Sequence, residues 1–422
     1  MITPATRRAA SGVAVLAAGA LALSACGSDD GGSNADSDGP IELSIATFND
    51  FGYSDELLAE YEAEHDVKIV HNKAATTDDA RANFFQKLGS GGLSDIEAIE
   101  VDWLPEVMEY SDMLTPVPDG LKGRWLDWKE AAATDADDNL IAYGTDIGPE
   151  AVCYREGLFA DAGLPTDPDE VAGLFGTWDD LFQTGQEYVD ATGEPFLDSA
   201  SSVFQALINQ QEKTFEDTDN SIIATDNPAV REVFDTTVEN ANDIAAYPDQ
   251  WSEDWYAAMA NGEFAAMMCP PWMLGIIEGE APDVDDWRIA NAFPGGGGNW
   301  GGSYLTVPTQ GENVEAAQEL ADWLTSPETQ IKAFKNAGTF PSQPDAYESD
   351  ELLGYTNDYF GGAALGEIGI ERAEAVSVEP YKGSNYFQIR DALNDAVTRV
   401  FNGTESADKA WDTWANEVSS IG

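Results

Sequence analysis

Apolar and polar residues alternate along the chain in a pattern that predicts strands separated by helices. Three apolar or alternating runs near the start of the ordered part predict strands, at 41–45, 67–70 and 95–101. Ser54 is suited to cap a helix between the first two, and residues 78–88 have helical spacing between the second and third. Because strands and helices alternate, we expect an α/β fold with a mainly parallel sheet and right-handed crossovers.

Ligands bind a sheet of this kind at the carboxyl ends of its strands. That edge follows the first and third predicted strands, at 49–53 and 100–103. The polar and aromatic candidates for ligand contact there are Asn49, Phe51, Tyr53, Glu100, Asp102 and Trp103.

The later part of the chain is richer in helical patterns. Four segments have helical periodicity: 313–325, 328–337, 386–401 and 406–418. The chain has 422 residues, which exceeds what one hydrophobic core normally organises. We therefore expect two lobes, joined by strand-like crossovers at 140–154 and 302–308.

A glycine-rich stretch surrounds Trp300, with four glycines before Asn299 and two after Trp300. Glycine lets a backbone approach a partner closely, so a tryptophan on a pliant loop before the strand-like 303–307 is suited to hold a flat ligand. The alternative is a turn whose Trp300 fills the core. Glycines at 296, 298 and 301 match a dinucleotide-binding fingerprint, but a strand follows them where that motif opens a helix, so we reject it.

The N-terminus predicts export and lipid anchoring. A basic pair precedes an apolar stretch that is too short to span a bilayer and ends in Leu23-Ser24-Ala25-Cys26. This tetrad is similar to the lipobox of bacterial lipoproteins, in which the cysteine is lipidated; an ordinary secretory signal is the alternative. We expect residues 1–25 to be the signal peptide, and 26–40 to be the lipidated Cys26 and a disordered tether.

The chain is strongly acidic, with 78 Asp and Glu against 20 Lys and Arg and a formal net charge of −58. Such a charge repels nucleic acid and anionic membranes, and we expect it to reflect adaptation to salt. With so many acids, a glycosidase-like carboxylate pair carries little information. The chain has no phosphate-binding loop, His65 and His71 lack metal-ligand spacing, and residues 135–139 lack the glycine of a calcium loop. We expect no cofactor, no metal and no enzymatic activity.

Cys153 and Cys269 are the cysteines that remain beyond Cys26. An exported protein seldom keeps two idle thiols, so the sequence favours a disulfide between them, with two buried free thiols as the alternative.

Tryptophan combined with carboxylate is typical of a site for a neutral sugar. A sugar ring packs its C–H face on an indole, and its hydroxyls need carboxylates, amides or backbone groups. Among the 12 tryptophans, Trp272 and Trp300 lie beside prolines or glycines, and Tyr304 follows in the predicted strand. Trp272 fits a core position equally well.

Several motifs make the chain similar to a known family. They are Thr47-Phe48-x-x-Phe51-Gly52-Tyr53, Gly144-Thr145-Asp146-Ile147-Gly148, Cys153-Tyr154-Arg155, Cys269-Pro270-x-Trp272-Met273-Leu274-Gly275 and residues 294–303. From about residue 41 onward the chain resembles the extracellular solute-binding proteins of family 1, the maltose-binding-like group. Within that group it resembles actinobacterial lipoproteins for cellobiose and cello-oligosaccharides.

The resemblance implies a type II periplasmic-binding-protein fold. Its two lobes, each a mainly parallel sheet flanked by helices, close on a ligand in the cleft between them. We expect residues 41–150 and 304–340 to form the N-terminal lobe, and 151–303 and 341–422 to form the C-terminal lobe.

The resemblance also implies ligand contacts. Trp272 and Trp300 are expected to touch the sugar, and Asp146 lies inside a shared motif. Residues 98–103 depart from relatives with two consecutive acids, so either Glu100 or Asp102 is the expected acceptor.

The implied function is that of a monomeric, lipid-anchored receptor on the extracellular face of the cell membrane. It would capture a short oligosaccharide and deliver it to the permease subunits of an ABC importer, which has a separate ATPase. The alternatives are a receptor for xylobiose, a maltodextrin or a chitobiose-type sugar, a secreted carbohydrate-active enzyme, and an adhesion protein.

Overall fold

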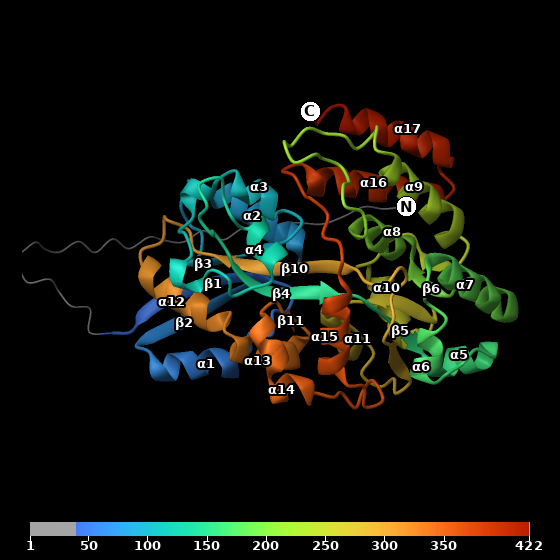
Figure 1. Cartoon of the computed structure of the whole chain (residues 1–422), viewed down its shortest axis with the longest axis horizontal. Coiled ribbons are helices and arrows are strands. Elements are labelled where there is room, and N and C mark those ends of the chain that lie inside the picture. The colour runs from blue at the N-terminus through green and yellow to red at the C-terminus, as the bar shows by residue number, and fades with distance from the viewer. Residues whose placement is uncertain (1–38, 422) are drawn as a thin grey trace, which may run out of the picture. The chain divides into compact units, whose positions relative to one another are not determined.

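Two β-sheets organise residues 39–421, which are the part of the chain that the computed structural model describes (Figure 1). The first sheet has six strands in the order β11-β4-β10-β3-β1-β2, and the second has five in the order β7-β6-β8-β5-β9. The first contains β1 (Ile41–Phe48), β2 (Val67–Ala74), β3 (Ile96–Glu100), β4 (Tyr143–Pro149), β10 (Asn299–Thr306) and β11 (Phe340–Pro341). The second contains β5 (Ala151–Arg155), β6 (Leu197–Ser199), β7 (Ala245–Tyr247), β8 (Ala266–Cys269) and β9 (Trp287–Ala290).

The helices lie between and around these strands. Those of the first third are α1 (Asp55–Glu64), α2 (Thr77–Lys87), α3 (Leu104–Met108) and α4 (Asp127–Ala132). The middle third has α5 (Glu156–Ala162), α6 (Pro168–Ala172), α7 (Trp178–Thr192), α8 (Ala200–Asn209), α9 (Pro228–Thr236), α10 (Glu253–Asn261) and α11 (Pro271–Glu280). The last third has α12 (Val314–Leu324), α13 (Pro327–Ala337), α14 (Asp350–Leu353), α15 (Leu365–Ala375), α16 (Tyr386–Phe401) and α17 (Ala407–Val418). None of the helices within residues 39–421 combines the length and apolar character needed to cross a membrane.

Both sheets are mixed, which corrects the expectation that they are mainly parallel. The pairs β1–β2, β1–β3, β6–β7 and β6–β8 are parallel, as alternating strands and helices predict. The pairs β10–β3, β10–β4, β11–β4, β5–β8 and β5–β9 are antiparallel. The antiparallel strands of the first sheet are returned from distant parts of the chain, so no local pattern fixes their direction.

Local sequence signals set several helix ends. Ser54 caps α1 by accepting a hydrogen bond from the amide of Leu57, and Ser406 caps α17 by accepting from the amide of Lys409. The helix predicted at 386–401 is α16, with Ile389, Leu393 and other apolar residues on its buried face. These ends and faces agree with the sequence because both depend on residues a few positions apart.

Each sheet has its own hydrophobic core. Leu43, Ile45 and Ile99 belong to the core of the six-stranded sheet, and Tyr154 and Phe196 belong to that of the five-stranded sheet. A third core lies around α11 and α13 and includes Met273 and Phe334. Separate cores for separate sheets are what two lobes require; the residue bounds that the sequence assigns to the lobes remain predictions.

The second half of the glycine-rich stretch, with Gly301 and Gly302, belongs to β10, while residues 295–298 lie in the turn before it. The strand begins at Asn299, so Trp300 lies in the strand. The prediction that it lies on a loop before the strand is wrong. The pairing of β10 with β4 is irregular between Asn299 and Gly302, where Gly301 and Gly302 have φ of 74° and 111°. Only glycine adopts these angles freely, so the irregular pairing keeps Trp300 within a distorted strand.

A disulfide joins Cys153 on β5 to Cys269 on β8, whose Cα atoms are 5.5 Å apart. This is the pairing that the sequence favours over two free thiols. Both cysteines are buried in the core around α11, so the bond ties neighbouring strands of the second sheet to each other.

Candidate functional site

The strands β4 and β10 lie side by side (Figure 1) and bring Gly148 against Trp300. The amide of Gly148 donates to Oδ1 of Asn299 at 2.9 Å. A Cβ on Gly148 would lie 1.8 Å from the carbonyl oxygen of Trp300 and 2.8 Å from Nε1 of Trp272. The close approach of the strand to both tryptophans therefore depends on the absence of a side chain at position 148.

Trp272 and Trp300 form an aromatic corner. Trp272 lies at the start of α11, and its Nε1 donates to the carbonyl oxygen of Trp300 at 3.0 Å. The two ring centroids are 5.0 Å apart with an interplanar angle of 75°. Both residues are half-buried, so part of each indole stays available to a ligand. Trp272 is thus not the fully enclosed core residue that the sequence allowed as an alternative.

A set of charged side chains is buried near these strands, and we call it the buried charge cluster. It consists of Glu100, Asp102, Lys129, Asp146, Glu150, Glu379, Lys382 and Arg390. Its members come from β3 and the residues after it, from α4, from β4 and its junction with β5, and from α16 and the segment before it. The cluster adjoins the aromatic corner, because a Cβ on Gly302 would lie 3.3 Å from Nζ of Lys129 and one on Gly298 would lie 2.8 Å from Oε2 of Glu150.

Asp102 is the paired centre of this cluster. Its carboxylate accepts from Nζ of Lys382 at 2.8 Å and also binds the guanidinium of Arg390. Burial and the charge of Asp102 raise the pKa of Glu100 to about 8. Oε2 of Glu100 accepts from the amide of Asp102 at 2.8 Å. Because Asp102 is already paired with two cations, Glu100 is better placed than Asp102 to accept a hydrogen bond from a ligand.

Lys129, on α4, is fully buried against β4 and β10. Its Nζ donates to the carbonyl oxygen of Asp146 at 2.6 Å and lies 4.1 Å from the ring centroid of Tyr304. The Tyr304 hydroxyl donates to the carbonyl oxygen of Lys129 at 3.1 Å. Burial lowers the pKa of Lys129 to about 8, so this cation is costly to keep in place and is held by an oxygen and an aromatic face.

Glu150 and Glu379 offer oxygens without partners. Neither carboxylate oxygen of Glu150 has a hydrogen-bond partner among residues 39–421, and nor does Oε1 of Glu379. Burial, followed by the charge of Glu379, raises the pKa of Glu150, and burial raises the pKa of Glu379 to about 7. A raised pKa keeps a carboxyl group protonated to higher pH, and the protonated group both donates and accepts hydrogen bonds. Two such groups beside an aromatic corner suit an uncharged ligand that carries hydroxyls.

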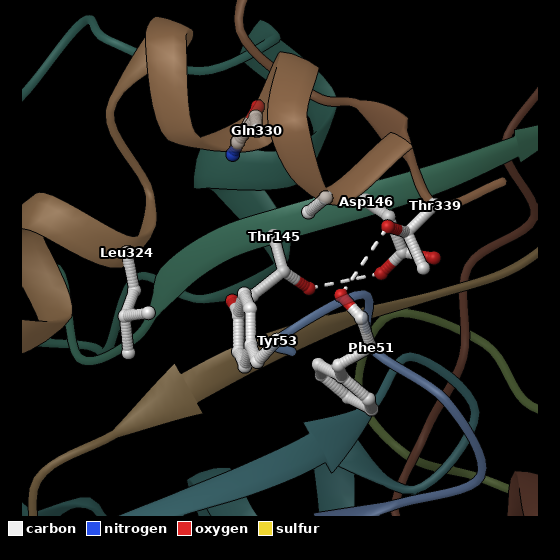
Figure 2. Close-up of a pocket in the computed structure, with 8 residues that line it drawn as sticks. Phe51, Tyr53, Thr145, Asp146, Leu324, Gln330 and Thr339 are labelled. Atoms are coloured by element: carbon white, nitrogen blue, oxygen red, sulfur yellow. Dashed lines mark hydrogen bonds between the residues drawn. The ribbon is translucent and has the colours of Figure 1, made fainter. Parts of the chain in front are cut away.

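Three further candidates surround a small cavity under the first sheet. Phe51, Tyr53 and Asp146 line it together with Thr145, Leu324, Gln330, Ala333 and Thr339 (Figure 2). Oγ1 of Thr145 donates to Oδ1 of Asp146 at 2.9 Å. The cavity has room for about one water molecule, so it is too small for a sugar ring. Ligand contact by Phe51, Tyr53 and Asp146 stays a prediction.

Two predicted site residues lie elsewhere. Trp103 is 1% exposed and packs in the core of the first sheet against Phe84 and Phe85. In this structure the rings of Trp103 present no free face, and ligand contact by Trp103 stays a prediction. Asn49 is exposed at the end of β1 with φ of 48°, and its contact with ligand remains a prediction.

Sequence reasoning missed five members of the charge cluster: Lys129, Glu150, Glu379, Lys382 and Arg390. The three cations were detectable in principle, since basic residues are scarce in a chain with 20 of them against 78 acids. The two glutamates carry no such signal, because their environment is created by distant segments.

Comparison with known proteins agrees with this geometry. A family model for bacterial extracellular solute-binding proteins matches residues 56–358. A crystal structure of an extracellular solute-binding protein of family 1 is 42% identical, with a TM-score of 0.81, and the match covers 90% of this chain and 99% of that one. The arabinooligosaccharide-binding protein of Bacillus subtilis is 25% identical over 88% of this chain and 89% of its own length.

A binding protein of Bifidobacterium animalis subsp. lactis in complex with β-1,6-galactobiose has the same fold. It is 20% identical with a TM-score of 0.75, and the match covers 90% of this chain and 97% of that one. These matches confirm the two-lobe α/β fold that the sequence predicted.

Proposed function

Because the chain belongs to the bacterial extracellular solute-binding proteins, we propose that it is the receptor of an ABC importer for a short oligosaccharide of the cellobiose or cello-oligosaccharide type. It hands the sugar to the transmembrane permease, which works with a separate ATPase. The family consists of binding proteins, so the chain is not an enzyme.

The observation that carries the proposal is the aromatic corner beside unpartnered carboxyl groups. Trp272 and Trp300 supply two apolar faces at an angle of 75°, and Glu150 supplies two buried oxygens without partners among residues 39–421. The C–H face of a pyranose packs on indole, while its hydroxyls satisfy buried acceptors that would otherwise cost free energy.

The site supports the class of the ligand, and the sequence motifs support the identity of the sugar. Relatives carry names that specify arabinooligosaccharides and lactose, and the resemblance in sequence motifs favours cello-oligosaccharides. Xylobiose, maltodextrins and chitobiose-type sugars are alternative ligands of the same site. Lipid anchoring through Cys26 on the extracellular face of the membrane, the signal peptide and a monomeric state belong to the proposal, and residues 1–38 lie outside the described part of the chain.

A thermal-shift screen against di- and trisaccharides tests the proposal. A receptor gains stability from a ligand that binds only its folded state, so at least one β-linked oligosaccharide should raise Tm and remain intact on chromatography after incubation. A rise in Tm accompanied by sugar cleavage would support an enzyme instead. The absence of any shift across cellobiose, xylobiose, maltose, chitobiose, lactose and arabinobiose would refute the proposal.

A further inference from the structure

Trp251 is a large apolar residue in an unusual position. Its side chain is 45% exposed, and its backbone has φ of 71°. Positive φ is strained for a bulky residue, and such strain persists where the surrounding structure imposes it, often at ligand sites. Exposure and strain together call for a reason other than core packing.

A buried carboxylate holds the segment on both sides of Trp251. Oδ2 of Asp198, in the middle of β6, accepts from Nε2 of Gln250 at 2.8 Å and from Nε1 of Trp255 at 3.0 Å. Asp198 is 0% exposed and also accepts from the hydroxyl of Ser202. Because residues 250 and 255 are both tied to one rigid acceptor, the chain between them is held in one conformation with Trp251 at its outer point.

Trp251 continues the aromatic corner outward. Its ring centroid is 6.1 Å from that of Trp272 with an interplanar angle of 27°, and 6.2 Å from that of Trp300 with an angle of 62°. Trp251 is thus offset-stacked on Trp272, and its exposed side chain continues the apolar surface toward solvent. The three indoles form one connected apolar surface, of which Trp251 is the most exposed part.

We propose that Trp251 forms an outer sugar subsite, so that the receptor prefers oligosaccharides longer than a disaccharide. The inference rests on the proposed function, since it assigns the inner rings to Trp272 and Trp300. An indole covers about one pyranose ring, and the outer ring of a longer chain would pack on the free face of Trp251. The strained backbone is the structural cost of presenting that face.

Calorimetric titration of the wild-type protein and Trp251→Gly with two matched pairs of sugars tests this subsite. The pairs are cellobiose with cellotetraose, and α-1,5-arabinobiose with α-1,5-arabinotetraose. Glycine accepts φ of 71° without strain, so the variant should fold with a Tm close to that of the wild type. We expect its affinity for the bound tetrasaccharide to fall about tenfold and its affinity for the matching disaccharide to change less than twofold.

Tyr110→Ala is the matched control. Tyr110 is 39% exposed and packs on Phe85 of α2, so its loss removes an exposed aromatic without touching the three indoles of the proposed site. Equal affinity of Trp251→Gly and wild type for the tetrasaccharide, or equal losses for both chain lengths, would overturn the outer subsite while leaving the proposed function intact. A wild-type protein that binds neither tetrasaccharide would also overturn the outer subsite, while the thermal-shift screen decides the proposed function.

Discussion

Lys382 and Asp102 form an ion pair of 2.8 Å whose side chains are 6% and 3% exposed. Asp102 follows β3 of the first sheet. Lys382 precedes α16, whose Ile389 and Leu393 pack in the core of the second sheet. The pair, joined by Arg390, therefore links the two sheets through buried charge.

Removal of the Asp102 charge should destabilise the protein strongly. Asp102→Asn leaves Lys382 and Arg390 without their carboxylate, and breaking a buried pair by removing one partner costs roughly 3–5 kcal/mol. The measurement is the free energy of unfolding from urea denaturation.

Asp217→Asn is the control for this prediction. The ion pair of Asp217 with Lys213 has the same 2.8 Å separation, but Asp217 is 38% exposed and Lys213 is 56% exposed. Loss of this pair should leave the urea midpoint nearly unchanged. Equal effects of the two substitutions would contradict the assigned role of the buried pair.

A methyl group at position 148 should disrupt the meeting of β4 and β10. The Cβ of Gly148→Ala would lie 1.8 Å from a backbone oxygen of Trp300, and a backbone atom cannot move aside as a flexible side chain can. We expect a loss of about 3 kcal/mol or more in stability, together with weaker sugar binding.

Gly279→Ala provides the comparison. Gly279 lies in α11, and a Cβ there would meet nothing within 4 Å, so alanine should stabilise the protein by up to about 1 kcal/mol. If Gly148→Ala is equally well tolerated, the close contact with Trp300 does not constrain the fold.

Stability should fall as pH rises through the neutral range, in part because of Glu97. Burial raises the pKa of this carboxyl from 4.5 to about 7. Between these values the folded state keeps a proton that the unfolded state has lost. The contribution of Glu97 to the free energy of unfolding is therefore full below pH 4.5 and is lost as pH rises through about 7. The side chain of Glu97→Gln stays neutral, so the stability of this variant relative to the wild type should rise by up to about 3 kcal/mol between pH 4.5 and pH 8. Parallel pH curves of urea midpoints for the two proteins would rule this out.

Salt should stabilise the chain. Its formal net charge is −58, and dense like charges oppose compaction. The Debye length falls from about 10 Å at 0.1 M to about 3 Å at 1 M, so Tm without sugar should rise clearly between 0.1 M and 2 M NaCl, and KCl should act alike. A flat or falling Tm would mean that the acidic surface serves solubility alone.

The sequence predicts those features that depend on neighbouring residues. The cap Ser54 and the span of α16 follow from spacing within one or two turns, and the structure has them where expected. The family, the two lobes and the Cys153–Cys269 pairing also follow, since they depend on motifs and on a count of cysteines.

Features that depend on distant pairing could not be predicted. The direction of β10 is set by β3 and β4, from which it is separated by more than a hundred residues, so the mixed sheets were missed. Trp103 follows one predicted strand and Trp300 precedes another, so their local patterns are alike. Trp103 is nevertheless enclosed by Phe84 and Phe85, whereas Trp300 is half-buried. Trp251 was missed because neither its exposure nor its backbone angle is encoded by local pattern.

The most direct test of the central claim is calorimetric titration of Trp300→Ala with the oligosaccharide that stabilises the wild type. The substitution retains the backbone oxygen that accepts from Trp272 at 3.0 Å, so the neighbouring indole should stay in place while one apolar face is lost. Trp323→Ala, on α12 beside Tyr61, controls for the general loss of an indole and should bind as the wild type does. We predict that Trp300→Ala alone loses roughly 1–3 kcal/mol of binding free energy, which is a five- to hundredfold weaker affinity. Unchanged affinity in a folded Trp300→Ala protein would contradict a sugar site at the aromatic corner.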